Sequence, residues 1–319
     1  MGRGTGESVG FVRTVRAAVV TGAVLVVAVV SGCTVPSTLP DGSVPQVAPV
    51  GLNGMAQDPT AVGGNVWAAD YFGHQLLRFD PDTGRIAERN GGLCDTDDVV
   101  VAPDGSLIAT CAGEGTVVRV QRDGTVGVLA VVGRGVNPIA LEPGGEAVVV
   151  GFGTTDDDRL LRVPLDGGPV EVVADGLPVL NGFGFGPDGR LYAPTGGVEA
   201  LLGSTGGLIA IDVATGSTEV IPLQFDEPGR TGLAFAVGVD VGPDGTVYIA
   251  QGVDPALYAV DPSTGHATLV GTSPEAAADN VLVLSDGRIL LSGFVGNSVV
   301  VFSPDGTGGW NRTVIAVGS

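Results

Sequence analysis

Residues 181–195, NGFGFGPDGRLYAPT, contain the pattern that decides the fold: an apolar strand, a Pro-Asp-Gly turn and a second apolar strand. Clear further copies are DDVVVAPDGSLIATC at 97–111, VGVDVGPDGTVYIAQ at 237–251 and DNVLVLSDGRILLSG at 279–293. Two weaker copies begin at Asn53 and Asn137. Short apolar runs separated by Gly-containing turns are typical of β-hairpins. The sequence therefore contains six related hairpins.

Each hairpin is followed by further strand-like sequence. A third apolar run, such as QLLRFD at 75–80 or LYAVD at 257–261, leads into a DPxTG-type turn and a fourth run. Repeats of this length with four strands each are the signature of propeller blades. The sequence predicts an all-β fold, a six-bladed β-propeller of four-stranded blades, over residues 51–319. A β-sandwich would not explain six turns in phase.

The amino-acid composition argues against two classes of protein, nucleic-acid binders and disordered chains. The chain has 319 residues, 35 acidic side chains and 15 basic ones, all of them Arg, and a net charge of −20. Such a surface offers no basic stripe for phosphates, so we expect no nucleic-acid partner. A hydrophobic content of 44% argues against disorder. We expect the domain to be a monomer.

The N-terminus has the features of an export signal. Arg3, Arg13 and Arg16 precede an apolar run over residues 17–30. As a helix this run would rise only about 21 Å, which is short for about 30 Å of hydrocarbon. It therefore favours a secretory signal peptide over a membrane span.

The sequence Val30-Ser31-Gly32-Cys33 resembles a bacterial lipobox. We expect residues 1–32 to be a lipoprotein signal peptide, Cys33 to be lipidated, and the Pro-rich residues 33–50 to form a tether. This places the protein on the outer face of the bacterial cytoplasmic membrane, held by its lipid anchor. An ordinary signal peptide followed by a chance cysteine is the alternative.

The other two cysteines are Cys94 and Cys111. Outside the cytoplasm a remaining pair most simply forms a disulfide, and their spacing does not fit a metal knuckle. Two free buried thiols are the alternative.

One sequence position lies at the same distance from the turn in each of the six repeats. Six residues before the Pro, or its equivalent, of each Pro-Asp-Gly-like turn, the first strand of the blade enters the central channel. The residues at this position, here called the channel ring, are Asn53, Asp97, Asn137, Asn181, Val237 and Asp279. Converging side-chain oxygens suit Ca²⁺, which takes six to eight oxygen ligands. Asn and Asp also favour turns before strands for purely structural reasons.

The same geometry places the loops between second and third strands on the face of the ring. That face should carry Tyr71, His74 and Glu199, the last within a long loop at 195–207 that could act as a lid. The segment 45–50, PQVAPV, could close the propeller as an extra edge strand of the last blade.

The segment 181–195, the six repeats and the DPxTG turns resemble the senescence-marker-protein/gluconolactonase family and are similar to the wider calcium-dependent propellers, over about residues 50–318. NHL-type propellers share such turns. The resemblance implies a metal held by Glu, Asn, Asn and Asp at channel positions of blades one, three, four and five. It also implies hydrolysis of a lactone or ester, in which the metal polarises the carbonyl.

Asn137 and Asn181 match the two Asn positions of that pattern, but Asn53 replaces the Glu and Val237 replaces the Asp. Asp97 and Asp279 could supply the missing charge. Asp240, three residues after Val237, should point to the opposite strand face unless a bulge intervenes.

Two functions follow. The first is a metal-dependent lactone or ester hydrolase, with Ca²⁺ as the cofactor. Its metal ligands would come from Asn53, Asp97, Asn137, Asn181 and Asp279, and Asp97, Asp279 or Glu199 would assist the attacking water. The second is a non-catalytic propeller that binds a ligand or protein partner at the cell surface.

Overall fold

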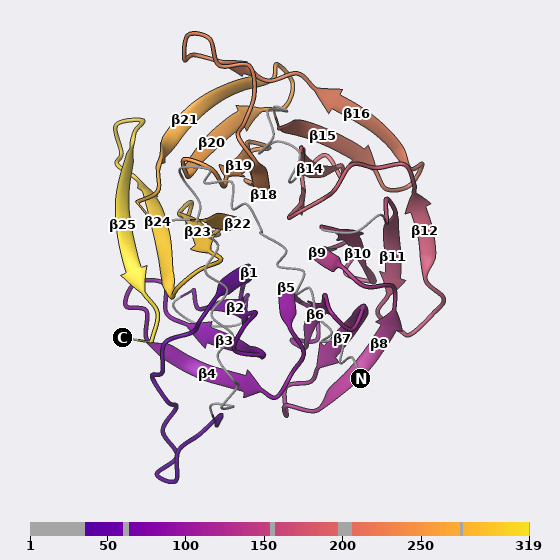
Figure 1. Ribbon diagram of the computed structural model, residues 1–319, viewed down its shortest axis with the longest axis vertical. Helices are drawn as coiled ribbons and strands as arrows, with labels where there is room; N and C mark the ends of the chain where they lie inside the picture. Colours follow the sequence, from indigo (N-terminus) through magenta and orange to yellow (C-terminus); the bar gives the residue numbers. More distant parts are fainter. Residues whose placement is uncertain (1–35, 60–63, 154–156, 197–205, 275–276, 319) are drawn as a thin grey trace, which may run out of the picture. The chain divides into compact units, whose positions relative to one another are not determined.

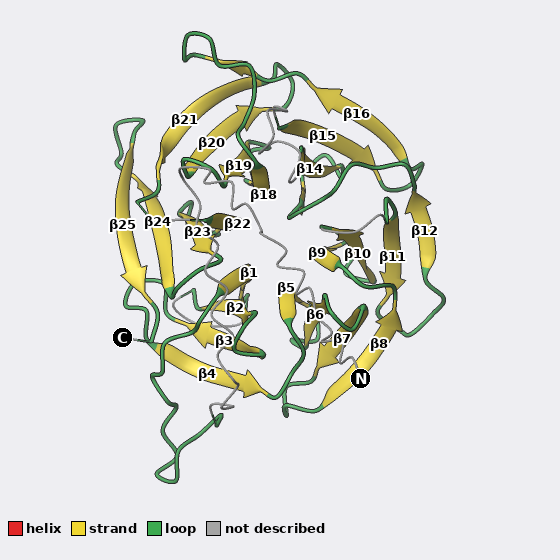
Figure 2. Ribbon diagram, viewed as in Figure 1, coloured by secondary structure: helices red, strands yellow, loops and turns green. Residues whose placement is uncertain are grey.

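The computed structural model describes residues 36–59, 64–153, 157–196, 206–274 and 277–318, which belong to one compact unit. Their regular elements are β-strands, and Figures 1 and 2 show them as six sheets around a common axis. The predicted six-bladed β-propeller is confirmed, and the sandwich is excluded. No helix in the described part of the chain is long and apolar enough to cross a membrane.

The first three blades have four antiparallel strands each, in chain order from the axis outward. Blade 1 consists of β1 (Leu52–Gln57), β2 (Val66–Asp70), β3 (Gln75–Phe79) and β4 (Ile86–Gly91). Blade 2 consists of β5 (Thr96–Val101), β6 (Leu107–Cys111), β7 (Thr116–Val120) and β8 (Val126–Val131). Blade 3 consists of β9 (Val136–Leu141), β10 (Ala147–Phe152), β11 (Leu160–Pro164) and β12 (Glu171–Ala174).

The other three blades follow the same plan. Blade 4 consists of β13 (Gly184–Phe185), β14 (Leu191–Thr195), β15 (Gly207–Asp212) and β16 (Ser217–Ile221). Blade 5 consists of β18 (Ala236–Val241), β19 (Val247–Gln251), β20 (Ala256–Asp261) and β21 (His266–Thr272), with β17 (Gln224–Phe225) added in parallel to β21. Blade 6 consists of β22 (Ala278–Val283), β23 (Ile289–Gly293), β24 (Ser298–Pro304) and β25 (Trp310–Ala316).

The Pro-Asp-Gly turns owe their shape to their Asp and Gly residues. In blade 5, the Asp244 Oδ1 accepts a hydrogen bond of 3.0 Å from the Thr246 backbone N–H, and Gly245 has φ +87°. Blade 2 repeats this with Asp104, whose Oδ1 accepts a 2.9 Å bond from the Ser106 N–H. An Asp side chain that closes the turn and a Gly in the left-handed region fix the hairpin.

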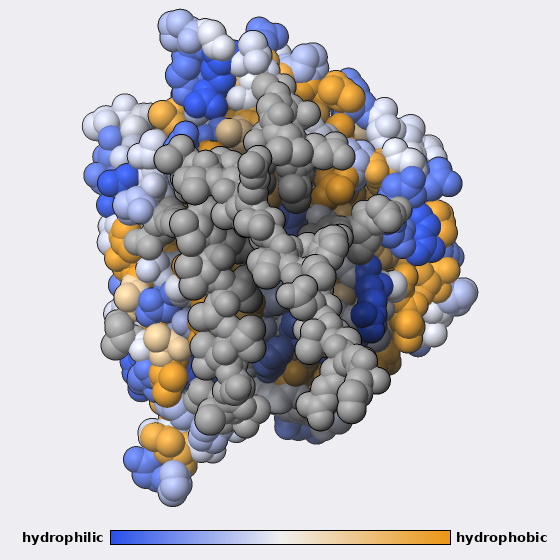
Figure 3. All heavy atoms as spheres, viewed as in Figure 1, coloured by the Kyte–Doolittle hydropathy of each residue, from blue (hydrophilic) through white to orange (hydrophobic). Residues whose placement is uncertain are grey.

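The apolar core lies between neighbouring blades. One cluster, for example, joins Leu52 and Leu77 of blade 1 to Leu290 and Val299 of blade 6, all four fully buried. Because each blade buries both faces against its neighbours, its strands carry nearly continuous apolar runs. Among the described strands, the exposed large apolar residues lie on the outermost strand of a blade, as Val172 of β12 does at 57% exposure. Figure 3 shows patches of apolar residues along the outer rim of this view.

Blades 1 and 6 close the ring without exchanging a strand. The Gln57 Nε2 donates a 3.0 Å hydrogen bond to the Ser285 hydroxyl, and the Gln57 Oε1 accepts a 2.8 Å hydrogen bond from the Ser285 N–H. The Gly318 N–H donates a 2.9 Å hydrogen bond to the Gly84 carbonyl. Residues 45–50 do not form the expected edge strand. They pack mainly on blade 1, where the Arg89 guanidinium donates hydrogen bonds to the carbonyls of Pro45 and Val47. Their end also contacts blade 6, since the Gly296 N–H donates a 3.2 Å hydrogen bond to the Val50 carbonyl. Pro45 and Pro49 have no backbone N–H group, so this short segment has few donors for the hydrogen bonds between β-strands.

Candidate functional site

The channel ring lies at a β-bulge in the first strand of several blades. The pairing of first and second strands shifts register between Thr96 and Val99 in blade 2 and between Ala278 and Val281 in blade 6. Asp97 and Asp279 are therefore inside the bulge. A bulge turns a side chain away from its regular direction, and here the carboxylates enter the channel.

Two hydrogen bonds pair acids with amides in the ring. The Asn53 Nδ2 donates to Asp97 Oδ1 at 2.6 Å, and Asn53 and Asp97 are 3% and 7% exposed. The Asn181 side chain makes a hydrogen bond with the Asp279 carboxyl. Four of the five predicted polar ring members are thus brought together in pairs.

The two ring carboxyls hold their protons unusually tightly. Burial, followed by the charges of Asp279 and Asp98, raises the pKa of Asp97 well above its ordinary value, although the Asn53 hydrogen bond acts against this. Burial likewise raises the pKa of Asp279 to about 7. A buried carboxylate needs a cation or a proton to offset its charge, and no described cationic side chain bonds to either group.

A second polar layer lies deeper in the channel. The Asp98 carboxylate accepts hydrogen bonds from the N–H groups of Val99 (2.8 Å) and Ile139 (3.2 Å) and from the Asn280 side chain. Gly54 makes room for it, because a Cβ at residue 54 would lie 1.8 Å from the Asp98 Oδ1. Burial raises the pKa of Asp98 to about 7. This layer follows the ring by one residue along the first strands of blades 2 and 6.

Asp240 also reaches the channel. A bulge between Ala236 and Val239 intervenes, and the Asp240 carboxylate accepts hydrogen bonds from the N–H groups of Val241 (2.8 Å) and Val283 (2.7 Å). With Asp98 it lines a cavity of about 310 Å³ on the side of the channel away from the ring. The sequence analysis expected Asp240 to face the channel only if a bulge intervened, and it did not single out Asp98 or Asn280, because a bulge changes which strand positions face the axis.

A third group of residues surrounds the mouth of the channel. The Tyr71 hydroxyl donates a 3.3 Å hydrogen bond to Asp95, and burial, with the Asp95 and Asp97 charges, raises the pKa of Tyr71 to about 12. A hydrogen bond with Asp95 raises the pKa of Glu114. Tyr71, Phe72 and Phe294 form an aromatic cluster with ring centroids 5.2–5.8 Å apart. Asp95 and Glu114 had not been singled out in the sequence.

The disulfide stands beside this group. Cys94 precedes β5, Cys111 ends β6, and their Cα atoms are 5.6 Å apart. The bridge joins the segment that carries Asp95 to the strand that precedes Glu114. It therefore holds the two acids of the mouth next to each other.

The remaining predicted residues are less well connected. Among the described ring members, none makes a hydrogen bond with the Asn137 side chain. Gly153 leaves space for that side chain, since a Cβ at residue 153 would lie 2.8 Å from the Asn137 Nδ2. Val237 is fully buried and contributes no ligand. Glu199, most of the loop at 195–207 and the lipobox cysteine Cys33 lie outside the described residues.

The donor set fits a hard divalent cation. Asn53, Asp97, Asn137, Asn181 and Asp279 offer amide and carboxylate oxygens, the ligands that Ca²⁺ prefers. The burial of Asp97 and Asp279 without a cationic partner among the described side chains is the structural observation in favour of a cation. The set lacks the nitrogen and sulfur ligands that zinc prefers.

No protein-family model and no curated protein matches the sequence. Solved structures do share the fold. A gluconolactonase from Xanthomonas campestris is 18% identical with a TM-score of 0.62, over 78% of this chain and 85% of that one. The calcium-binding protein regucalcin from Agrobacterium tumefaciens is 17% identical with a TM-score of 0.58, over 77% and 83%.

A virginiamycin B lyase from Staphylococcus aureus is also similar, at 14% identity and a TM-score of 0.59 over 84% of each chain. The neighbours thus include the gluconolactonase- and regucalcin-like propellers that the sequence resembles. At these identities the likeness shows the fold, and one fold serves different reactions.

Proposed function

We propose that the channel ring binds Ca²⁺ and that the protein hydrolyses a small lactone or ester at the mouth of the channel. The observation that carries this proposal is the pair of ring carboxyls, Asp97 and Asp279, each bonded to an amide and neither to a described cation. The gluconolactonase and regucalcin neighbours support it through their fold.

Four residues of the channel ring have a part in this proposal. Asn137 and Asn181 would hold the ion through neutral oxygens, and Asp97 and Asp279 would supply its charge. When bound, calcium would act as a Lewis acid on the substrate carbonyl. The aromatic cluster of Tyr71, Phe72 and Phe294 offers an apolar wall beside the mouth.

A carboxyl of the ring can also act on the attacking water. A general base must be ionised at the operating pH. Without a metal ion, burial raises the pKa of Asp279 to about 7, and a bound cation would lower it and favour the ionised carboxylate. Asp279 or Asp97 would accept the proton of water while the other keeps its charge. Glu199 is a third candidate for this role.

The test combines metal analysis with an assay. The purified protein should contain calcium, or gain thermal stability with added calcium, and should hydrolyse members of a panel of γ- and δ-lactones and aryl esters. Chelation should abolish the hydrolysis. If millimolar calcium does not change the melting temperature and no other metal co-purifies, the hydrolase proposal fails.

The second candidate is a propeller that binds a ligand without catalysis. Its support is the two ring positions held by Asn53 and by the fully buried Val237. The resemblance to the gluconolactonase family implies carboxylates at these two positions. Fewer charges weaken a calcium site. Calcium binding without hydrolysis of any panel member would favour this function.

We also propose that Cys33 carries a lipid and anchors the protein on the outer face of the bacterial cytoplasmic membrane. Residues 36–43 are almost wholly exposed, whereas Pro45 and Pro49 are buried against the propeller. The tether would therefore end near residue 44, where the chain docks on blade 1.

A further inference from the structure

Three blades carry an arginine at the same position of the third strand. Arg78, Arg119 and Arg162 pair with Trp67, Ile108 and Val149 of the second strands, which are equivalent in the repeat. In blades 1 and 3 this arginine has two acidic neighbours. One follows the first strand and the other lies opposite it on the fourth strand.

The acidic partners are well defined in those two blades. Arg78 contacts Asp58 at 3.5 Å and Glu88 at 3.0 Å. Arg162 makes two hydrogen bonds to Glu142, at 2.8 and 2.9 Å, and lies 3.7 Å from Glu171. These ion pairs tie the inner, third and fourth strands of a blade together.

Blade 2 has lost both partners. The residue equivalent to Asp58 and Glu142 is Ala102, and Gly127 lies opposite Arg119 on the fourth strand. No hydrogen bond or ion pair joins the Arg119 guanidinium to any described residue, and its Nε is buried without a partner. Hydrogen bonds from Ser106 lower the pKa of the Asp104 carboxyl, and the Arg119 charge contributes to this without a direct contact.

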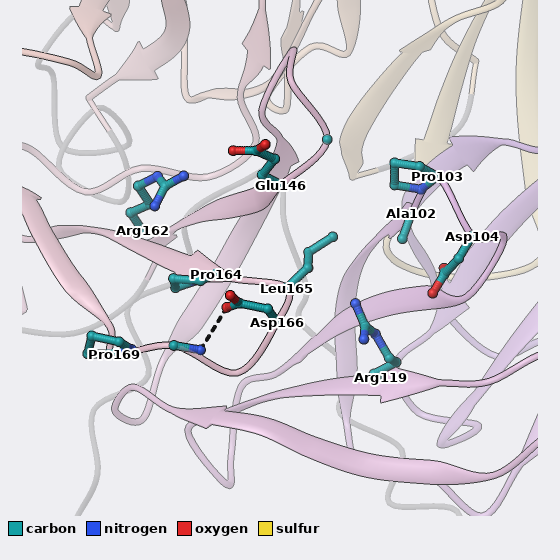
Figure 4. Close-up of a pocket in the computed structure, with 12 residues that line it drawn as sticks. Ala102, Pro103, Asp104, Arg119, Glu146, Arg162, Pro164, Leu165, Asp166 and Pro169 are labelled. Carbon is teal, nitrogen blue, oxygen red and sulfur yellow. Dashed lines mark hydrogen bonds between the residues drawn. The ribbon is translucent and has the colours of Figure 1, made fainter.

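The unpaired guanidinium faces a cavity. A space of about 680 Å³ lies between the turns of blades 2 and 3, on the face of the propeller opposite the channel ring. Figure 4 shows Arg119 pointing between the turn of Asp104 and the turn of Leu165 and Asp166. Pro103, Pro164 and Leu165 give the cavity apolar walls.

We propose that this cavity binds a small monocarboxylate with an apolar body, held by Arg119. A guanidinium bonds a planar carboxylate through two parallel hydrogen bonds, which would replace the carboxylates that blades 1 and 3 supply internally. The proline and leucine walls would cover the apolar body. Asp104, Glu146 and Asp166 also line the cavity and disfavour a more highly charged anion such as phosphate.

The test uses benzoate and hexanoate as probes, with inorganic phosphate for comparison. Each is titrated into the purified ¹⁵N-labelled protein while the arginine Nε–H signals are recorded, and Arg119→Gln identifies the Arg119 signal. We expect benzoate and hexanoate to shift that signal saturably in the millimolar range, and phosphate to bind more weakly.

Gly127→Glu provides the decisive variant, because it restores the partner that Arg162 has in Glu171. A Cβ at residue 127 meets no atom within 4 Å, so the fold should tolerate it. Gly127→Glu should weaken benzoate binding at least tenfold, whereas Gly127→Gln, of the same size without charge, should retain it. The proposal fails if no carboxylate shifts the Arg119 signal, if phosphate binds better, or if Gly127→Glu binds benzoate as the wild type does.

Discussion

The Asn53 Nδ2 donates a 2.6 Å hydrogen bond to the Oδ1 of Asp97, which joins the inner strands of blades 1 and 2 at the mouth of the channel. This bond directs the Asn53 amide nitrogen to the acid and leaves its carbonyl oxygen available. It also means that Asp97 has a neutral partner, so the charge of the carboxylate is not compensated. The Asn53 carbonyl oxygen and the Asp97 carboxylate could therefore both bind a cation.

Asp97→Asn and Asp279→Asn should each reduce the stabilisation that calcium gives. The substitution keeps the shape of the side chain and removes the ionised oxygen, and a ligand stabilises only by its preference for the folded state. Calcium titrations of the melting temperature measure this. Asn137→Ala and Asn181→Ala should also lose the response, with calcium-free stability within about 1–2 kcal/mol of the wild type.

Asp158→Asn is the matched control, since Asp158 is exposed and its substitution changes the net charge equally. It should leave the calcium response intact. A ring with a solely structural role predicts the opposite pattern: no calcium response in the wild type, and loss of stability in the ring variants without calcium.

Without calcium, stability should fall as the pH rises from about 5 to 8. Burial raises the pKa values of Asp98 and Asp279 to about 7 and of Asp240 to about 6, whereas the unfolded chain titrates near pH 4. These carboxyls bind protons more tightly when folded. Their contribution is complete below about pH 4 and is lost as the pH passes the folded pKa values.

Calcium should reverse the effect, because it competes with protons for the ring carboxylates. Its stabilisation should therefore be larger at pH 8 than at pH 5. Urea unfolding at both pH values, with calcium or with a chelator, measures the four stabilities. Asp98→Asn should reduce the calcium-free pH dependence, since an amide does not ionise, while Asp279 and Asp240 still contribute. Equal or greater calcium-free stability at pH 8 would refute this account.

Much of the fold could be predicted because the Pro-Asp-Gly hairpins repeat, and counting back from each turn also located Asn53, Asp97, Asn181 and Asp279. The deeper layer of Asp98 and Asn280 was not predicted. Strand alternation gives the direction of a side chain only when pairing is regular, and the bulges after Thr96 and Ala278 break it. Pairs such as Asp95 and Glu114 depend on loop conformation, which periodicity does not encode.

The disulfide should stabilise the propeller. Linking Cys94 to Cys111 closes a loop of 17 residues, and a loop of this size is worth about 3 kcal/mol. The Cys94→Ser/Cys111→Ser variant should be less stable by about that amount in urea, while reductant should destabilise the wild type alone. Thiol counting on the denatured, unreduced protein without its lipobox cysteine should find no free thiol; two free thiols would contradict the bridge.

The lipid anchor can be tested independently of the propeller. Cys33→Ser should abolish labelling by a radioactive fatty acid and release the protein from membranes, or cause precursor to accumulate, because the thiol is the site of attachment. Cell fractionation and labelling measure both effects. An unlabelled wild type, with membrane retention unchanged in the variant, would refute the anchor.

Gly54→Ala should destabilise the protein by about 3 kcal/mol, near the upper end for overpacking. A Cβ at residue 54 would lie 1.8 Å from the Asp98 Oδ1 and 2.5 Å from its Cα, so a strand of blade 2 would have to move. Gly127→Ala is the control, since a Cβ there meets nothing within 4 Å. Urea unfolding compares the two variants. Gly54→Ala should cost less in an Asp98→Gly background than in the wild type, because the contact with the Asp98 carboxylate is gone, and an equal cost in both backgrounds would assign it to the backbone contact.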